Sequence, residues 1–113
     1  MEKHNQLGLI AYLAERLGQK NKLGRKSVQK FIHIASEMGK VPTGYRFSFY
    51  TYGPYSRELA ADLELAEAID GVTSKQDATT GAFDIKAGKA SKAIILHSRL
   101  YLDQQKSKLE RIF

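Results

Sequence analysis

A dense aromatic segment, residues 45–56, constrains the fold of this chain more than any other part of the sequence. It reads Y-R-F-S-F-Y-T-Y-G-P-Y-S and holds six of the chain's eleven Phe and Tyr residues. Tyr45, Phe47 and Phe49 alternate with more polar residues, which predicts a strand with one buried face. The Gly-Pro pair at 53–54 then ends this strand, because proline cannot donate a ladder hydrogen bond. We expect the buried face to belong to the core rather than to a ligand platform.

Three helices surround this segment in the sequence. Apolar residues at helical spacing predict helices over residues 4–18, 25–38 and 56–69, and Ser56 is the expected N-cap of the third. The predicted core residues of these helices are Leu7, Ile10, Ala11, Ala14, Leu17, Val28, Phe31, Ile32, Ala35, Met38, Leu59, Leu63, Ala66 and Ile69. The third helix is acidic: five acids and one arginine lie between residues 56 and 70. These acids lack any sequence sign of the partnered environment that acid–base catalysis requires.

The C-terminal part is predicted to hold a two-stranded ribbon and one long helix. The strands are expected at 72–76 and 82–86, and the helix from about residue 89 to 111. Leu96 and Leu100 fall nearly opposite the main apolar stripe of that helix. Either the helix is enclosed by the domain, or its second face meets another copy of the chain, and we expect a homodimer contact through Leu96 and Leu100.

Length and composition indicate one ordinary globular domain over residues 1–113. The chain has no cysteine, which excludes disulfides and thiolate chemistry. Its apolar runs are far shorter than the roughly 20 residues that cross a bilayer, so we expect a cytoplasmic protein with no membrane partner. The three histidines lack metal-ligand spacing. The sequence therefore predicts a protein that is not an enzyme and needs no cofactor.

The order helix, helix, strand, helix, ribbon, helix predicts an α+β fold of winged-helix-like type, with the third helix in the recognition position. Three motifs sharpen this reading: V-Q-K-F at 28–31, G-Y-R-F at 44–47 and Y-G-P-Y-S-x-E-L at 52–59. Together they resemble the YwgA-like family of uncharacterised bacterial proteins, and more distantly the SocA-like (Panacea) antitoxin domains. The resemblance covers residues 7–75. It implies a winged-helix-like core and a prokaryotic, toxin–antitoxin-like setting, but no known activity.

Two functions are compatible with these observations. The net charge is +6, and five basic residues without an acid lie between residues 20 and 30. This patch predicts weak, largely non-specific DNA binding through phosphates, unless it is only a solvated surface. The expected nucleic-acid contacts are Lys20, Lys22, Arg25, Lys26, Lys30 and Arg57. The alternative is a protein–protein interaction module, an antitoxin or adaptor, that uses the acidic third helix and the apolar C-terminal helix.

Overall fold

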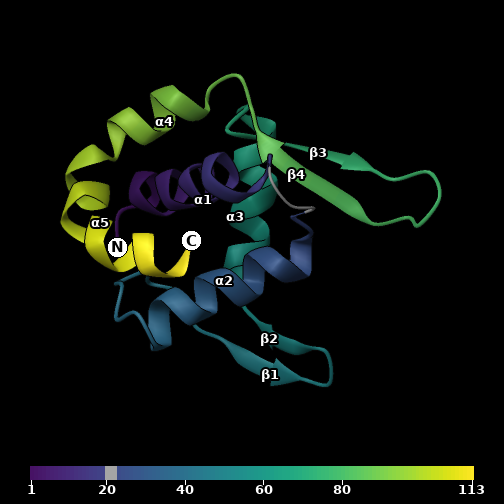
Figure 1. The fold of residues 1–113 in the computed structure, drawn as a ribbon, viewed down its shortest axis with the longest axis horizontal. Coiled ribbons are helices and arrows are strands. Elements are labelled where there is room, and N and C mark those ends of the chain that lie inside the picture. The colour runs from purple at the N-terminus through teal and green to yellow at the C-terminus, as the bar shows by residue number, and fades with distance from the viewer. Residues whose placement is uncertain (20–22) are drawn as a thin grey trace.

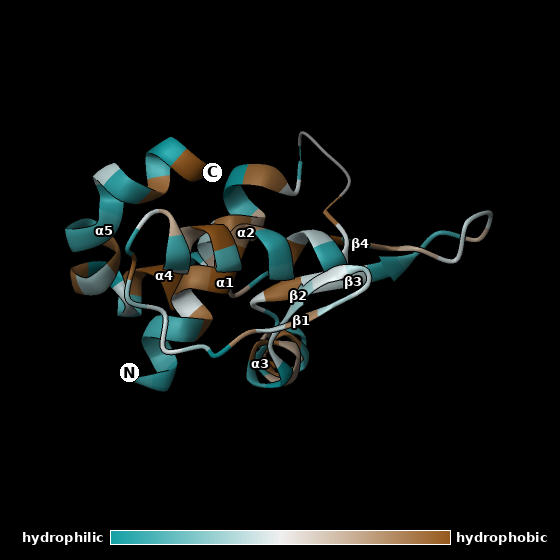
Figure 2. Cartoon of the chain, turned by 90° about the horizontal axis from the view of Figure 1, so that it is seen from below, coloured by the Kyte–Doolittle hydropathy of each residue, from teal (hydrophilic) through white to brown (hydrophobic). Residues whose placement is uncertain are grey.

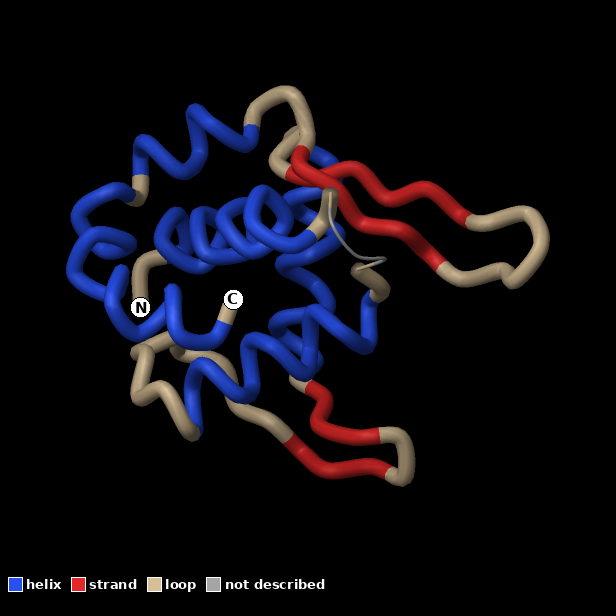
Figure 3. Tube along the Cα trace, viewed as in Figure 1, coloured by secondary structure: helices blue, strands red, loops and turns tan. Residues whose placement is uncertain are grey.

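The computed structural model describes residues 1–19 and 23–113. Within them the chain forms an α+β globule of five helices and two small antiparallel sheets of two strands each (Figures 1 and 3). Helix α1 (Lys3–Leu17) lies at the centre and packs against α3 (Arg57–Ala68), α4 (Ser91–His97), α5 (Arg99–Ile112) and the β3–β4 ribbon. Its apolar residues therefore form the middle of the core (Figure 2).

Helix α2 (Arg25–Glu37) is amphipathic and buries only one side. Val28, Ile32 and Ala35 face the core, as the sequence predicts. Phe31 is half-buried and packs against it. Met38, expected in the same stripe, is 78% exposed because α2 ends one residue earlier and Met38 lies beyond its last turn.

The aromatic segment forms a hairpin rather than one strand. Strand β1 (Ser48–Tyr50) turns back at residues 51–52 and pairs with β2 (Gly53–Tyr55), so the Gly-Pro pair lies within the second strand. Gly53 has φ +122°, a conformation that favours glycine. Tyr45 is buried in the core, but Phe49 is 72% exposed. The predicted single core face is thus wrong at Phe49, because the strand begins only at residue 48 and its hairpin projects from the domain (Figure 3).

The second ribbon follows the prediction closely. Strands β3 (Val72–Gln76) and β4 (Phe83–Ala87) pair in antiparallel register, and Val72 and Ile85 reach the core. Helix α3 is capped by Ser56, whose Oγ accepts a hydrogen bond from the N–H of Leu59, as expected of an N-cap. At its other end Ile69 is 42% exposed, which corrects its predicted place in the core, because the helix stops at Ala68.

The predicted long C-terminal helix is broken at Ser98. Helices α4 and α5 meet there at an angle (Figure 1), and the Ser98 hydroxyl donates to the carbonyls of Ile94 and Ile95. Such back-bonding by a serine commonly bends a helix. The Ser98 side chain also packs directly against Gly8 of α1, where a Cβ at position 8 would overlap it. The break therefore lets the C-terminal segment wrap around α1.

A buried carboxylate on α3 was missed by the sequence analysis. Asp62 accepts hydrogen bonds from the Tyr45 hydroxyl at 2.6 Å and from the Lys3 Nζ at 2.8 Å. Burial and, after it, the hydrogen bond to Asp62 raise the pKa of Tyr45 well above its usual range. Asp62 therefore ties the start of α1 to α3 and to the segment that leads into β1, so one acid of α3 is partnered after all.

None of the helices in residues 1–19 and 23–113 combines the length and the apolar character needed to span a membrane.

Gly8→Ala should destabilise the protein. In a helix interior this change ordinarily stabilises by about 1 kcal/mol. Here the added methyl group would overlap the Ser98 side chain, and we expect a loss of about 1–3 kcal/mol in the free energy of unfolding. Urea denaturation measures it. The double variant Gly8→Ala, Ser98→Gly should recover most of the loss; a single variant as stable as wild type would contradict the close approach.

Candidate functional site

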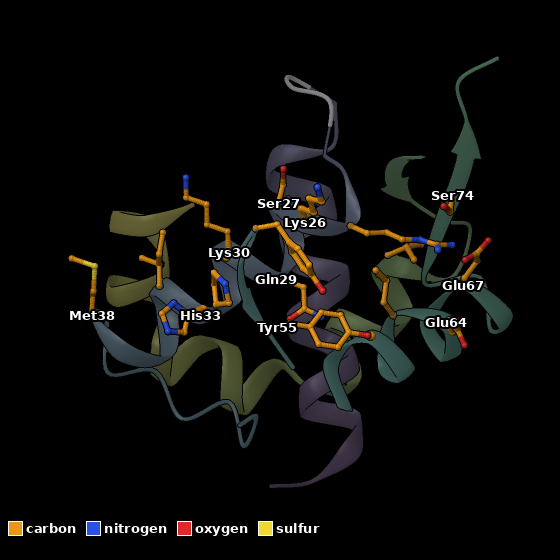
Figure 4. Close-up of a pocket in the computed structure, with 18 residues that line it drawn as sticks. Lys26, Ser27, Gln29, Lys30, His33, Met38, Tyr55, Glu64, Glu67 and Ser74 are labelled. Carbon is orange, nitrogen blue, oxygen red and sulfur yellow. The ribbon is translucent and has the colours of Figure 1, made fainter. Parts of the chain in front are cut away.

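An open groove of about 820 Å³ runs along the outer face of α2. We call it the α2–α3 groove; it is bounded by α2, strand β2, helix α3 and strand β3. In Figure 4, Met38 lies at one end, and Glu67 and Ser74 lie at the other. Its apolar lining includes Ile34, Ala60, Leu63 and Val72. The groove therefore joins segments that lie up to 49 positions apart in the sequence, Arg25 to Ser74.

The α2 side of the groove is basic. Lys26 and Lys30 are exposed residues one helical turn apart, and their side chains line this side (Figure 4). Arg25 also lines the groove, and its guanidinium stacks 3.8 Å from the centroid of the Phe83 ring. That stacking orients Arg25 toward the β3–β4 ribbon.

The α3 side is acidic. Glu64 and Glu67 stand one turn apart and line the groove at a distance along it from Lys30 (Figure 4). Next to them, the Ser74 Oγ is buried and has no hydrogen-bond partner among the described residues. The groove thus carries positive charge on α2 and negative charge on α3, with apolar side chains between them.

Aromatic side chains of the β1–β2 hairpin form the third boundary. Tyr52 is 60% exposed, stacks on Tyr50 with 5.7 Å between ring centroids, and has the Lys26 Nζ 5.4 Å from its own centroid. His33, on α2, makes edge contacts with the rings of Phe47 and Phe49. These contacts hold the hairpin beside α2, so its exposed rings stand next to the groove.

A pair of hydrogen bonds fixes the relative position of the groove walls. The Gln29 Nε2 donates to the Ser56 carbonyl at 2.9 Å, and the Ser56 N–H donates to the Gln29 Oε1 at 2.7 Å. Both residues are buried. The Gln29 amide therefore satisfies the main chain at the point where β2 ends and α3 begins.

The predicted nucleic-acid contacts do not form one surface. Arg25, Lys26 and Lys30 share the groove, but Arg57 lines a separate hollow of about 330 Å³ with Arg46 and Tyr50. Lys20 and Lys22 lie outside the described residues. The described part of the predicted patch, Arg25, Lys26 and Lys30, therefore lies together on α2, and Arg57 is separated from it.

Leu96 and Leu100 are 59% and 77% exposed. The alternative that the domain encloses these two side chains is therefore wrong. A homodimer contact through them stays a prediction.

Several groove residues were not anticipated as functional. Tyr52 contributes to the groove although the sequence analysis placed it in no site, and Glu64 and Glu67 were expected only as part of an acidic helix surface, not as a wall beside α2. The signal for Tyr52 was Gly53, which directly follows it and fits a two-residue hairpin loop better than a strand end. Nothing in the sequence indicated that α3 would turn its glutamates toward α2.

The histidines show no metal centre. The rings of His4 and His97 touch, with 4.9 Å between centroids, although 93 positions separate them in the sequence. Among the described residues, no group of three or more His, Cys, Asp and Glu side chains is placed to hold a metal ion.

Comparison with known proteins gives one partial similarity. The chain is 45% identical over 42 residues to an uncharacterised protein, YwgA, of Bacillus subtilis (strain 168). The matched segment is 37% of this chain, and the chain spans about a quarter of that protein's length, 25%. No protein-family model and no solved structure matches the chain. The predicted resemblance to YwgA is therefore confirmed over this segment, and the SocA-like resemblance stays a prediction.

Gln29→Leu should destabilise the protein, because it leaves the buried N–H of Ser56 without a partner. It also removes one of the two hydrogen bonds that the Ser56 carbonyl accepts, the other coming from the Ala60 N–H. We expect a loss of about 2 kcal/mol or more in the free energy of unfolding, measured by urea denaturation. Gln104→Leu makes the same chemical change at an exposed position of α5 and should stay within about 0.5 kcal/mol of wild type. Equal stability of the two variants would contradict the role of Gln29.

Proposed function

We propose that this protein is a non-enzymatic protein-docking module whose α2–α3 groove holds a segment of a partner protein. The observation that carries the proposal is the set of large apolar side chains exposed in and beside the groove: Met38 at 78%, Phe49 at 72% and Tyr52 at 60%. Methionine and aromatic residues are enriched in protein interfaces, and tyrosine is among the residues that most often carry a large share of the binding energy. Apolar side chains gathered around one groove mark such interfaces, whereas apolar side chains scattered singly over a surface do not.

The charges of the groove favour a protein segment over a nucleic acid. A duplex is a uniform polyanion, and Glu64 and Glu67 would repel its phosphates. A polypeptide can carry both signs and can match Lys26 and Lys30 on one side and the glutamates on the other.

We further propose that the chain is a YwgA-like protein with a winged-helix-like arrangement, in which α3 holds the recognition position and β3–β4 is the wing. The order of α1, α2, α3 and the ribbon supports this arrangement. The hairpin β1–β2 departs from it, because it lies between α2 and α3. An antitoxin or adaptor role fits such a module, since both act by holding another protein.

Filling the groove should weaken the binding of selected peptides. Random peptides displayed on phage are selected on the wild-type protein, and the enriched peptides are assayed by fluorescence anisotropy. Ala60→Trp places a large side chain in the groove and should weaken these peptides by at least about tenfold, 1.4 kcal/mol.

Ala61→Trp is the matched control, because residue 61 is exposed on the same helix and does not line the groove. It should bind like wild type. If no peptide is enriched, or if both tryptophan variants bind equally well, the docking function is wrong.

Non-specific DNA binding is the second candidate. It is favoured by the exposed Lys26 and Lys30 and by the stacked tyrosines beside them, which could contact phosphates and bases. Arg57 could add a phosphate contact only from its separate hollow.

This candidate predicts micromolar or weaker binding of duplexes at physiological salt, roughly independent of sequence. Lys26→Glu with Lys30→Glu should weaken binding and lower the log–log salt slope by about 0.9 for each lost contact. Lys92→Glu with Lys106→Glu makes the same charge change at exposed positions of α4 and α5. Equal binding by the two double variants would reject the α2 surface as a DNA site.

A further inference from the structure

We propose that the segment bound in the α2–α3 groove is an amphipathic α-helix with acidic residues along one edge and basic residues along the other. This inference rests on the docking function and adds to it the conformation and the charge pattern of the partner. It follows from three properties of the groove: the strands that border it, its length, and the distribution of its charges.

The strands beside the groove are unsuited to binding an extended peptide. A peptide that adds to a sheet needs a free edge with main-chain donors. The edge at β2 is only three residues long, and its central residue is Pro54, which has no N–H. Val72 and Ser74 of β3 line the groove two positions apart, so β3 turns its side-chain face toward the groove and not its edge.

The length of the groove fits a helix of about four turns. Its lining on α2 runs from Arg25 to Met38, a distance of roughly 20 Å at about 1.5 Å per residue. A partner helix of about 14 residues has the same length. Its apolar side chains, one or two per turn, would lie over Ile34, Ala60 and Leu63 and beside Tyr52.

The charges give the partner helix two different edges. An edge next to α2 meets Lys26 and Lys30, and farther along the groove, at the end away from Met38, an edge next to α3 meets Glu64 and Glu67 (Figure 4). A helix with acids on one edge and bases on the other pairs with both walls. A helix with only one sign of charge pairs with one wall and is repelled by the other.

The test uses synthetic peptides of about 14 residues, long enough for four helical turns. All carry the same leucine stripe. The first has Glu on one edge and Lys on the other, the second has Glu on both edges, and the third has Lys on both. A fourth repeats the first with a central proline, which prevents a continuous helix. Affinity is measured by fluorescence anisotropy, and helix formation on binding by circular dichroism.

Wild type should bind the mixed-edge peptide about tenfold more tightly than either single-sign peptide, since two exposed ion pairs together contribute about that factor. The proline peptide should lose at least as much affinity, and helicity should rise on binding. Glu64→Lys with Glu67→Lys makes both walls basic, and the all-Glu peptide should then become the tightest ligand. Ala60→Trp should weaken the mixed-edge peptide, and Ala61→Trp should not.

Several results would overturn the helix proposal while leaving the docking function intact. The first is that no designed peptide binds although phage-selected peptides still bind in the groove. The second is that the proline peptide binds as tightly as the mixed-edge peptide. The third is that the order of peptide affinities is the same in the Glu64→Lys, Glu67→Lys variant as in wild type. Sedimentation of wild type as a dimer that Ala60→Trp dissociates would make a second copy of the chain the occupant instead. Displacement of the mixed-edge peptide by duplex DNA at lower concentration than by unlabelled peptide would make it a nucleic acid.

Discussion

The side-chain amide of Gln29 is the contact on which the arrangement of α2, the hairpin and α3 depends. Gln29 donates to the Ser56 carbonyl and accepts from the Ser56 N–H, as a neighbouring strand would, while the Ser56 hydroxyl caps α3. A buried main chain must find such partners, and few side chains offer a donor and an acceptor with this spacing. The groove walls are consequently held as one unit before any ligand arrives, so that binding need not order them.

The helices and the β3–β4 ribbon could be predicted because their information is local. Apolar spacing marked Leu59 and Leu63, Ser56 marked the start of α3, and the turn residues near Gly81 marked the ribbon. The break at Ser98 could not be predicted from the helix itself. It depends on Gly8, which lies 90 positions away and is close to it only in the folded chain.

Only part of the candidate site could be predicted from the sequence, for the same reason. The basic face of α2 was visible as a charge pattern, whereas its opposite wall was not, because the orientation of Glu64 and Glu67 toward α2 is set by tertiary packing. The aromatic segment misled the prediction for a related reason. Alternation of apolar and polar residues identifies the two faces of a strand, but it does not show where the strand extends beyond the domain. Phe49 lies in the part that extends beyond the domain, so its side chain is exposed.

The central position of α1 has a consequence for synthesis in the cell. Leu9, Ile10 and Leu13 are buried by elements that include α4 and α5, and the Ser91 hydroxyl donates to the Glu15 carboxylate across 76 positions of sequence. A ribosome makes α1 before any of these partners exists. The apolar side chains of α1 therefore remain exposed to solvent until α4 and α5 have been synthesised. The contacts that bury them are non-local and form late in folding. During that interval the nascent chain exposes apolar surface that a chain with mainly local contacts would already have covered.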